Sequence, residues 1–199
     1  MADTDIPKDK TEFRYFILEV IGTLTAMIEE KDPFLKKHSV RVADNSANFC
    51  EEFKIFDEEG IESIYYAGLL HDIGKILLLK AFTGVSKQKR LNMDAIMANI
   101  QEAHISLGSL LVKRWGFDDK FIDVITHHED TNFSEDASQE ILVIHLANML
   151  TRTLGFSQFE EEVDFTELQS AQILKIAPET IENIGEELKQ ILQGVAHLF

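Results

Sequence analysis

Apolar residues recur every three or four positions along most of the chain, and few residues interrupt this pattern. The first such stretch carries Phe13, Phe16, Ile17, Val20, Leu24 and Ile28. This spacing gathers the side chains on one face of a helix. Only three prolines and ten glycines occur among the 199 residues, so little stops a helix once it has begun. We therefore predict an all-α protein.

The same pattern predicts roughly eight helices and no internal repeat. After a first helix that ends near Lys31, the expected helices cover about 33–53, 57–70, 92–115 and 118–129, with two or three more before the carboxy terminus. A short apolar segment at 76–82 and a loop precede the fourth helix. Asp57 is the predicted N-terminal cap of the third helix, and Pro178 is the predicted first residue of the last.

Composition and charge restrict the partners that this chain can bind. Its net charge of −16 argues against non-specific nucleic-acid binding and against binding to an anionic membrane surface. A single cysteine, Cys50, excludes an intrachain disulfide framework and fits a reducing compartment. No apolar run approaches the roughly 18 residues of a membrane span. We therefore expect a cytoplasmic protein.

The expected domain organisation is simple. Residues 1–10 are treated as a polar leader, and residues 11–199 as one domain. Within that domain, the motifs described below lie in a core of about 20–155, and extra helices occupy 156–199.

Two adjacent polar residues, His71 and Asp72, close the third predicted helix in the sequence AGLLHDIGK at 67–75. Buried polar groups need partners, so other polar residues should lie nearby. Four more histidines lie in or beside predicted helices: His38, His104, His127 and His128. A lone helical histidine is more often a surface or core residue than a ligand, and His145, on the apolar face of a late helix, is expected to be a core residue.

Taken together, the five histidines and Asp72 form a set suited to binding metal ions. Imidazole and carboxylate groups ligate Zn, Mn, Fe and Ni, and an aspartate can bridge two ions through its two oxygens. Facing helices of a bundle can hold two ions between them. Six ligands spread over four predicted elements suit two metals rather than one.

Four motifs resemble the HD superfamily of metal-dependent phosphohydrolases: HSVRVA at 38–43, AGLLHDIGK at 67–75, HISLG at 104–108 and HHE at 127–129. Within that superfamily they resemble the HD-GYP branch, whose members hydrolyse cyclic di-GMP at a two- or three-metal centre. The resemblance covers about residues 20–155 and implies an HD-domain helical bundle.

The resemblance also implies a ligand for each position of a metal centre. His38, His71 and Asp72 would hold one ion, and the aspartate would bridge to a second. The other ligands of the second ion would be His104, His127 and His128. The implied cofactors are one or two divalent ions of Fe, Mn, Ni or Zn.

Cations near the metals are expected to bind the substrate. Lys75 resembles the lysine that contacts the substrate phosphate in this family, so Asp72 and Lys75 are the implied catalytic residues. Arg41, one turn after His38, and Arg152 are further candidates for contacting a phosphate oxygen.

The chain departs from the HD-GYP pattern in three ways. Asn148 stands where the family has a late aspartate ligand, and its neutral amide oxygen should hold the first ion more weakly. No Gly-Tyr-Pro signature follows HHE, and the acidic run FEEEVD at 159–164 lies where the family has substrate-binding cations. We therefore expect little activity on cyclic di-GMP, a dianion that needs a second cationic clamp.

The second half of the chain is similar to the HDOD domains, which are signalling relatives of the HD fold; the similar stretches are 107–129 and 141–152. Two functions therefore stay open. One is metal-dependent hydrolysis of a phosphomonoester or phosphodiester, with a small phosphorylated ligand or nucleotide as the substrate. The other is an HDOD-like signalling or binding module with weak or no catalysis, which would act on a protein partner.

Overall fold

Helices make up the regular structure of the computed structural model, which describes residues 10–31, 37–86, 92–155 and 162–196 and shows no strand within them. The helices of these ranges are α1 (Lys10–Lys31), α2 (His38–Phe53), α3 (Glu58–Leu70), α4 (Ile73–Ser86), α5 (Met93–Trp115), α6 (Asp119–His127), α7 (Gln139–Thr153), α8 (Gln169–Leu174) and α9 (Pro178–Ala196). The predicted all-α class is confirmed.

Most helix ends follow from local sequence. The Asp57 carboxylate accepts a hydrogen bond from the backbone N–H of Gly60 at 3.0 Å, which confirms it as the N-terminal cap of α3. Pro178 begins α9, as predicted. The predicted start of the second helix, at about residue 33, lies outside the described residues. The apolar segment expected to be short is instead the first part of the 14-residue helix α4.

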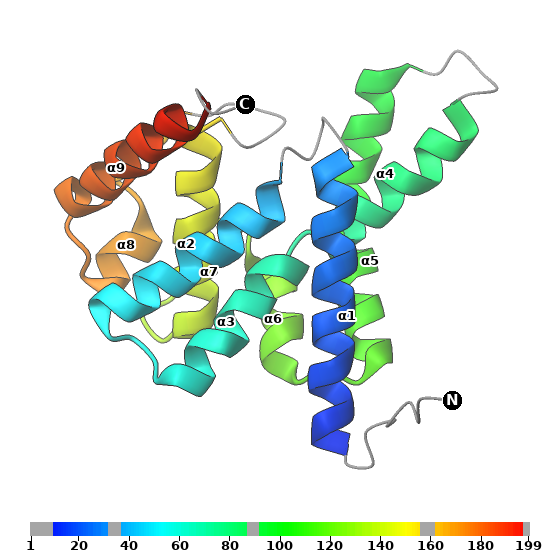
Figure 1. Ribbon diagram of the computed structural model, residues 1–199, viewed down its shortest axis with the longest axis horizontal. Coiled ribbons are helices and arrows are strands. Elements are labelled where there is room, and N and C mark those ends of the chain that lie inside the picture. The colour runs from blue at the N-terminus through cyan, green and yellow to red at the C-terminus, as the bar shows by residue number, and fades with distance from the viewer. Residues whose placement is uncertain (1–9, 32–36, 87–91, 156–161, 197–199) are drawn as a thin grey trace.

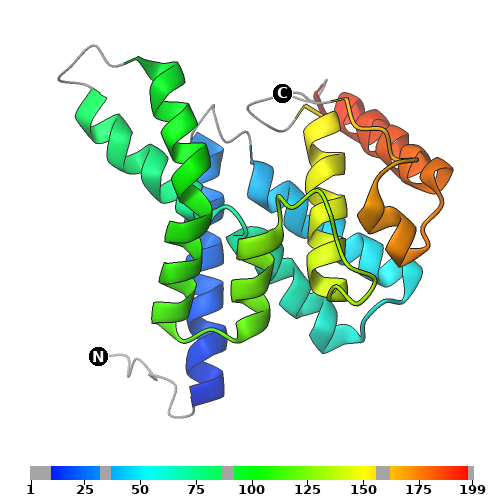
Figure 2. The ribbon, with the colours of Figure 1, turned by 180° about the vertical axis from the view of Figure 1, so that it is seen from behind.

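The helices form three groups that lie side by side (Figures 1 and 2). On one side α4 packs on α5, and α1 contacts both α3 and α4. On the other side α8 packs on α7, with α9 beyond it. Between these groups, α2, α3 and α6 join the two sides through contacts with α7 and α5. Across the described ranges, every helix is too short or too polar to span a lipid bilayer.

Helix α7 runs through the centre of the main hydrophobic core. All eleven residues from 141 to 151 are buried, so this helix has no solvent-facing side in that stretch. Two of its polar residues have partners: His145 bonds to the Ser170 hydroxyl at 2.9 Å, and the Thr151 hydroxyl accepts from the Asn45 amide at 3.0 Å. The prediction that His145 is a core residue is confirmed, since it is 4% exposed.

Helices α4 and α5 approach each other closely at Gly74. A Cβ atom at this position would overlap the backbone carbonyl of His104 and lie 2.8 Å from the backbone nitrogen of Gly108. A second small-residue contact brings α3 close to α2, where a Cβ atom at Gly68 would lie 2.6 Å from the Cα of Ala43. Two glycines of AGLLHDIGK therefore set the spacing of the helices on either side of the His-Asp pair.

Substituting Gly74 by alanine should push α4 away from α5. Because the obstacle is backbone, we expect the free energy of unfolding to fall by about 3 kcal/mol. Gly185→Ala on α9 is the matched control, because its nearest neighbour is the flexible end of the Leu150 side chain at 3.2 Å. Urea unfolding measures the stability of both variants. Equal stability of the two would contradict the close approach of α4 to α5.

The buried His145 side chain should make stability depend on pH. Burial, with the charges of Arg152 and His128, lowers its pKa from 6.5 to about 4. The unfolded chain therefore takes up a proton at this residue near pH 6.5, before the folded chain does, so acidification from pH 6.5 to 4 favours unfolding. The full effect of this residue is about 3 kcal/mol.

His145→Gln removes this titration while keeping a group that can bond to Ser170. Between pH 7 and pH 4 the free energy of unfolding should fall in both proteins. We expect the fall to be about 3 kcal/mol smaller in the variant than in the parent. Denaturant unfolding at several pH values measures the difference. An unchanged pH dependence would show that His145 is not held neutral in the folded protein.

Candidate metal centre

The His71–Asp72 pair lies in the turn between two helices. Helix α3 ends at Leu70 and α4 begins at Ile73, so the pair occupies the two positions between these helices. Both side chains are nonetheless buried, with His71 1% and Asp72 2% exposed. The polar pair that interrupts the apolar pattern is thus at the centre of the bundle, where it needs partners.

One oxygen of Asp72 faces the first pair of histidines. Its Oδ2 lies 3.8 Å from Nε2 of His38 and 3.7 Å from Nε2 of His71. The two imidazole Nε2 atoms are 3.3 Å apart. His38 is in the first turn of α2, so this group joins α2 to the α3–α4 turn.

The other oxygen of Asp72 faces a second pair of histidines. Its Oδ1 lies 3.6 Å from Nε2 of His104 and 3.5 Å from Nε2 of His128. His104 is in the middle of α5, and His128 is the cap residue directly after the end of α6. These five residues, His38, His71, Asp72, His104 and His128, are called the cluster below.

Backbone carbonyls orient the imidazoles of His71, His104 and His128. Nδ1 of His71 donates to the carbonyl of Gly68 at 2.7 Å, three residues earlier in the chain. Nδ1 of His104 and of His128 donate to carbonyls with the same spacing, at 2.8 Å each. Because a carbonyl only accepts, Nδ1 carries the proton and Nε2 presents a lone pair to Asp72.

Electrostatics hold the cluster in the form that binds cations. Burial lowers the pKa of His71 well below its usual value, and also lowers the pKa of His104, so both rings are neutral at pH 7. Burial alone would raise the pKa of Asp72, yet the Lys75 ammonium and nearby imidazoles hold it well below its usual range. At these three residues the centre therefore combines two neutral imidazoles with an ionised carboxylate.

The distances within the cluster run from 3.3 to 3.8 Å, at and slightly above the edges of a metal coordination sphere. Two ligands roughly 2.1 Å from one ion lie roughly 3.0–3.5 Å apart. The Nε2 atoms of His104 and His128, and Oδ1 of Asp72, are buried and have no hydrogen-bond partner among the described residues. A cation could satisfy such a set of unpartnered acceptors. Each half of the cluster could hold one ion.

Lys75 is also at this site. Its Nζ lies 3.2 Å from Oδ2 of Asp72, and its side chain is 14% exposed. Arg41 lies one turn after His38 on α2, where its charge opposes the burial that raises the pKa of Asp44. Of these two predicted substrate-binding residues, Lys75 has a described contact with the cluster.

His127 lies outside the cluster, contrary to the ligand set implied by the resemblance. Its side chain is 45% exposed, and its Nδ1 lies 2.7 Å from a carboxylate oxygen of Asp130 at the surface. Consecutive residues at a helix end point roughly 100° apart. Because His128 faces Asp72, its neighbour is turned away. Four of the five predicted histidines are therefore brought together.

Asn148 lies on α7 with neither of its amide atoms bonded to a described residue, and it is fully buried. This sets it apart from His145 and Thr151 on the same helix, which both have partners. A buried amide without partners points to an ion or a water at that place.

Glu129 was not singled out from the sequence, although it directly follows the two histidines of HHE. Its Oε1 accepts from the guanidinium of Arg152 at 2.7 Å, and its Oε2 accepts from the amide of Gln101 at 2.6 Å. Burial alone would raise its pKa, but His128, Lys75 and these two partners lower it. Arg152, a predicted substrate-binding residue, is therefore paired with a carboxylate beside the cluster.

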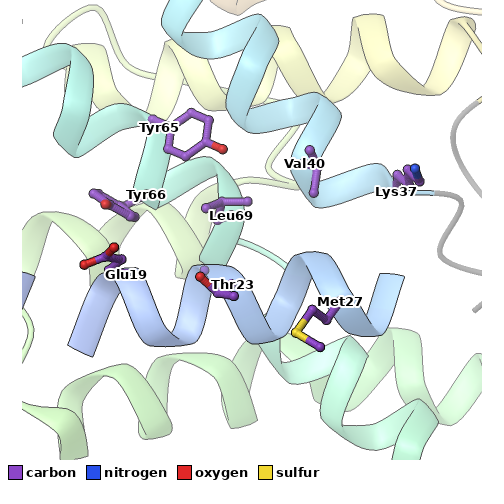
Figure 3. Close-up of a pocket in the computed structure, with 9 residues that line it drawn as sticks. Glu19, Thr23, Met27, Lys37, Val40, Tyr65, Tyr66 and Leu69 are labelled. Atoms are coloured by element: carbon purple, nitrogen blue, oxygen red, sulfur yellow. The ribbon is translucent and has the colours of Figure 1, made fainter. Parts of the chain in front are cut away.

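A cavity of about 410 Å³ lies between α1 and the α2–α3 pair (Figure 3). Glu19, Thr23 and Met27 of α1 face it from one side. Across from them are Tyr65, Tyr66, Leu69, Lys37 and Val40. None of the described residues that line the cavity belongs to the cluster, so it is separate from the metal centre.

Comparisons with known proteins add a family and a fold. A model of the HDOD domain family matches residues 22–131, a range that contains the whole cluster. An uncharacterized protein of Treponema pallidum (strain Nichols) is 26% identical over an alignment of 146 residues, and the match covers 65% of this chain but only 28% of that protein's length. The crystal structure of an HDOD domain protein with unknown function from Geobacter sulfurreducens has the same fold, with a TM-score of 0.62 and 19% identity, covering 94% of this chain and 69% of that one.

Asn148→Asp should strengthen metal binding and weaken the metal-free protein. A buried carboxylate without a partner destabilises a fold by about 3 kcal/mol or more, whereas an ion in contact with it would be held more tightly. Unfolding with a chelator and with Mn²⁺, together with calorimetric titration, measures both effects.

Asn45→Asp is the matched control, since Asn45 is also buried but bonds to Thr151. It should destabilise the protein with and without metal. If Asn148→Asp bound metal no more tightly than the parent, Asn148 would lie outside the coordination sphere.

Proposed function

The chain belongs to the HDOD domain family, and we propose that it is a metal-dependent phosphohydrolase acting on small phosphate esters, nucleotides included. The observation that carries this proposal is the placement of Asp72, whose two oxygens each face a different pair of imidazoles. A carboxylate shared in this way is the arrangement expected of a two-metal phosphohydrolase, as the resemblance to the HD superfamily implies.

The residues that would hold the ions are His38 and His71 on one side of Asp72, and His104 and His128 on the other. When bound, such ions lower the pKa of a water molecule and neutralise charge on phosphorus. The chain's own contribution is orientation. The carbonyl contacts of His71, His104 and His128 fix which nitrogen faces the site, so little rearrangement is needed on binding.

Lys75 and the start of α4 would bind the anionic substrate. Helix α4 begins at Ile73, directly after Asp72, so the positive end of its dipole lies at the centre. Lys75 is in the first turn of the same helix, is partly exposed and already contacts a carboxylate oxygen. A phosphate oxygen could take that place beside the ammonium when ions neutralise Asp72.

The small number of positively charged side chains near the cluster favours a substrate with one phosphate. Cyclic di-GMP carries two phosphates, and the segment 159–164, which lies where the family has substrate-binding cations, is acidic. Arg152, the other cation considered for this role, is paired with Glu129. Loss of a charged clamp typically costs about 2–5 kcal/mol, which would slow turnover of the larger substrate by orders of magnitude.

A second candidate is a regulatory module that binds metal or nucleotide without turnover. Asn148 favours this alternative, because a neutral amide in place of a carboxylate weakens the binding of an ion. A protein partner would then respond to the occupied state.

Turnover of a panel of phosphate esters by the metal-loaded protein separates these two functions. With Mn²⁺, Fe²⁺, Ni²⁺ or Zn²⁺ present, we expect hydrolysis of nucleoside monophosphates or simple phosphomonoesters and little or none of cyclic di-GMP. Asp72→Asn should abolish turnover. Lys75→Ala should lower it by about 100-fold, because one charged contact to the transition state is lost.

His127→Ala is the control, since this exposed histidine lies outside the cluster. It should leave turnover unchanged. Tight metal binding without turnover of any ester in the panel would exclude the hydrolase and favour the regulatory module.

A further inference from the structure

Glu129 lies beside the second half of the cluster with both carboxylate oxygens directed to it. Its Oε2 is 3.8 Å from Nε2 of His104, and its Oε1 is 4.0 Å from Nε2 of His128. These distances are close to those that join the same two nitrogens to Asp72. The carboxylate is 17% exposed, so it stands between the buried cluster and solvent.

The atoms that meet here are all hydrogen-bond acceptors. The Nδ1 protons of His104 and His128 are donated to backbone carbonyls, so their Nε2 atoms have only lone pairs to offer. Oδ1 of Asp72 and these two nitrogens have no hydrogen-bond partner among the described residues. A second carboxylate facing such a group is repelled unless a cation lies between them.

The far side of Glu129 is anchored by groups from two other helices. Arg152 on α7 holds one oxygen and Gln101 on α5 holds the other. Carboxylates that ligate metals are commonly fixed in this way by outer hydrogen bonds. Each oxygen of Glu129 is therefore held on one side, and faces an imidazole nitrogen on the other.

We propose that Glu129 is a ligand of the ion bound by Asp72, His104 and His128, and that Arg152 positions it. This inference rests on the metal centre of the proposed function. It gives the second half of the cluster two carboxylates. The first half has one carboxylate, that of Asp72, and the oxygen of Asp72 on that side also lies beside the Lys75 ammonium. The first equivalent of metal should consequently bind at the second half.

The test is a titration of the metal-free, full chain with Mn²⁺ by calorimetry and with Co²⁺ by visible absorption. Glu129→Gln should weaken binding of the first equivalent by about tenfold or more and should change the Co²⁺ spectrum. Arg152→Met should weaken it as well, with a smaller spectral change, because the ligand is still present. Glu129→Asp, which keeps the charge on a shorter side chain, carries the test if the Gln variant does not fold.

Asp130→Asn is the matched control. It removes the same charge from the next residue, whose carboxylate pairs with His127 at the surface. His104→Ala tests the metal centre itself. The inference predicts loss of the first equivalent in His104→Ala, weakening in Glu129→Gln and parent affinity in Asp130→Asn.

The other outcomes overturn it. Parent affinity in Glu129→Gln, with loss in His104→Ala, would remove Glu129 from the coordination sphere and leave the proposed function standing. Equal weakening in Glu129→Gln and Asp130→Asn would indicate long-range charge instead of ligation. Parent affinity in His104→Ala would remove the metal centre, and the proposed function with it.

Discussion

A carboxylate at the centre of a helical bundle is tolerated only if its surroundings stabilise its charge. Asp72 is 2% exposed, and removing an ion from water is costly unless it is paired. Four imidazoles, the Lys75 ammonium and the start of α4 surround it. The glycines that let α2 approach α3 and α4 approach α5 bring the helices close enough for these contacts. The close packing of the central helices thus places the groups that surround the Asp72 side chain.

In their neutral form the histidines do not stabilise that charge, because of a local rule of helix geometry. A histidine in or at the end of a helix can donate from Nδ1 to the carbonyl three residues earlier, and His71, His104 and His128 all do so. The proton is then committed to the backbone, and Nε2 is left as an acceptor. Three Nε2 acceptors and the Asp72 carboxylate cannot form hydrogen bonds with one another, because none of them carries a proton to donate. A cation between them would satisfy both, so the geometry that buries Asp72 also forms a candidate metal site.

The helical class and the position of the His71–Asp72 pair could be predicted from sequence, because both depend on local patterns of residues. Helix spacing predicted the all-α class, and the interruption by His71 and Asp72 marked the centre of the bundle. The length of α4 was missed, since its apolar start resembles a short buried segment. His127 and His128 could not be told apart, because the choice depends on where α6 ends and which way it faces. Glu129 was missed because its partners, Gln101 and Arg152, lie on other helices, and only tertiary packing reveals such contacts.

The cluster draws on residues from 38 to 128, so in folding terms it is built from long-range contacts. A nascent chain that ends within α5 already contains His38, His71 and Asp72, yet it lacks His128. We expect such contacts to close late, after the helices that carry them have formed and met. An ion bound by the second half would therefore act on the final assembly of the bundle. It would stabilise the docked α5–α6 pair against the rest of the protein, and slow the departure of these helices during unfolding.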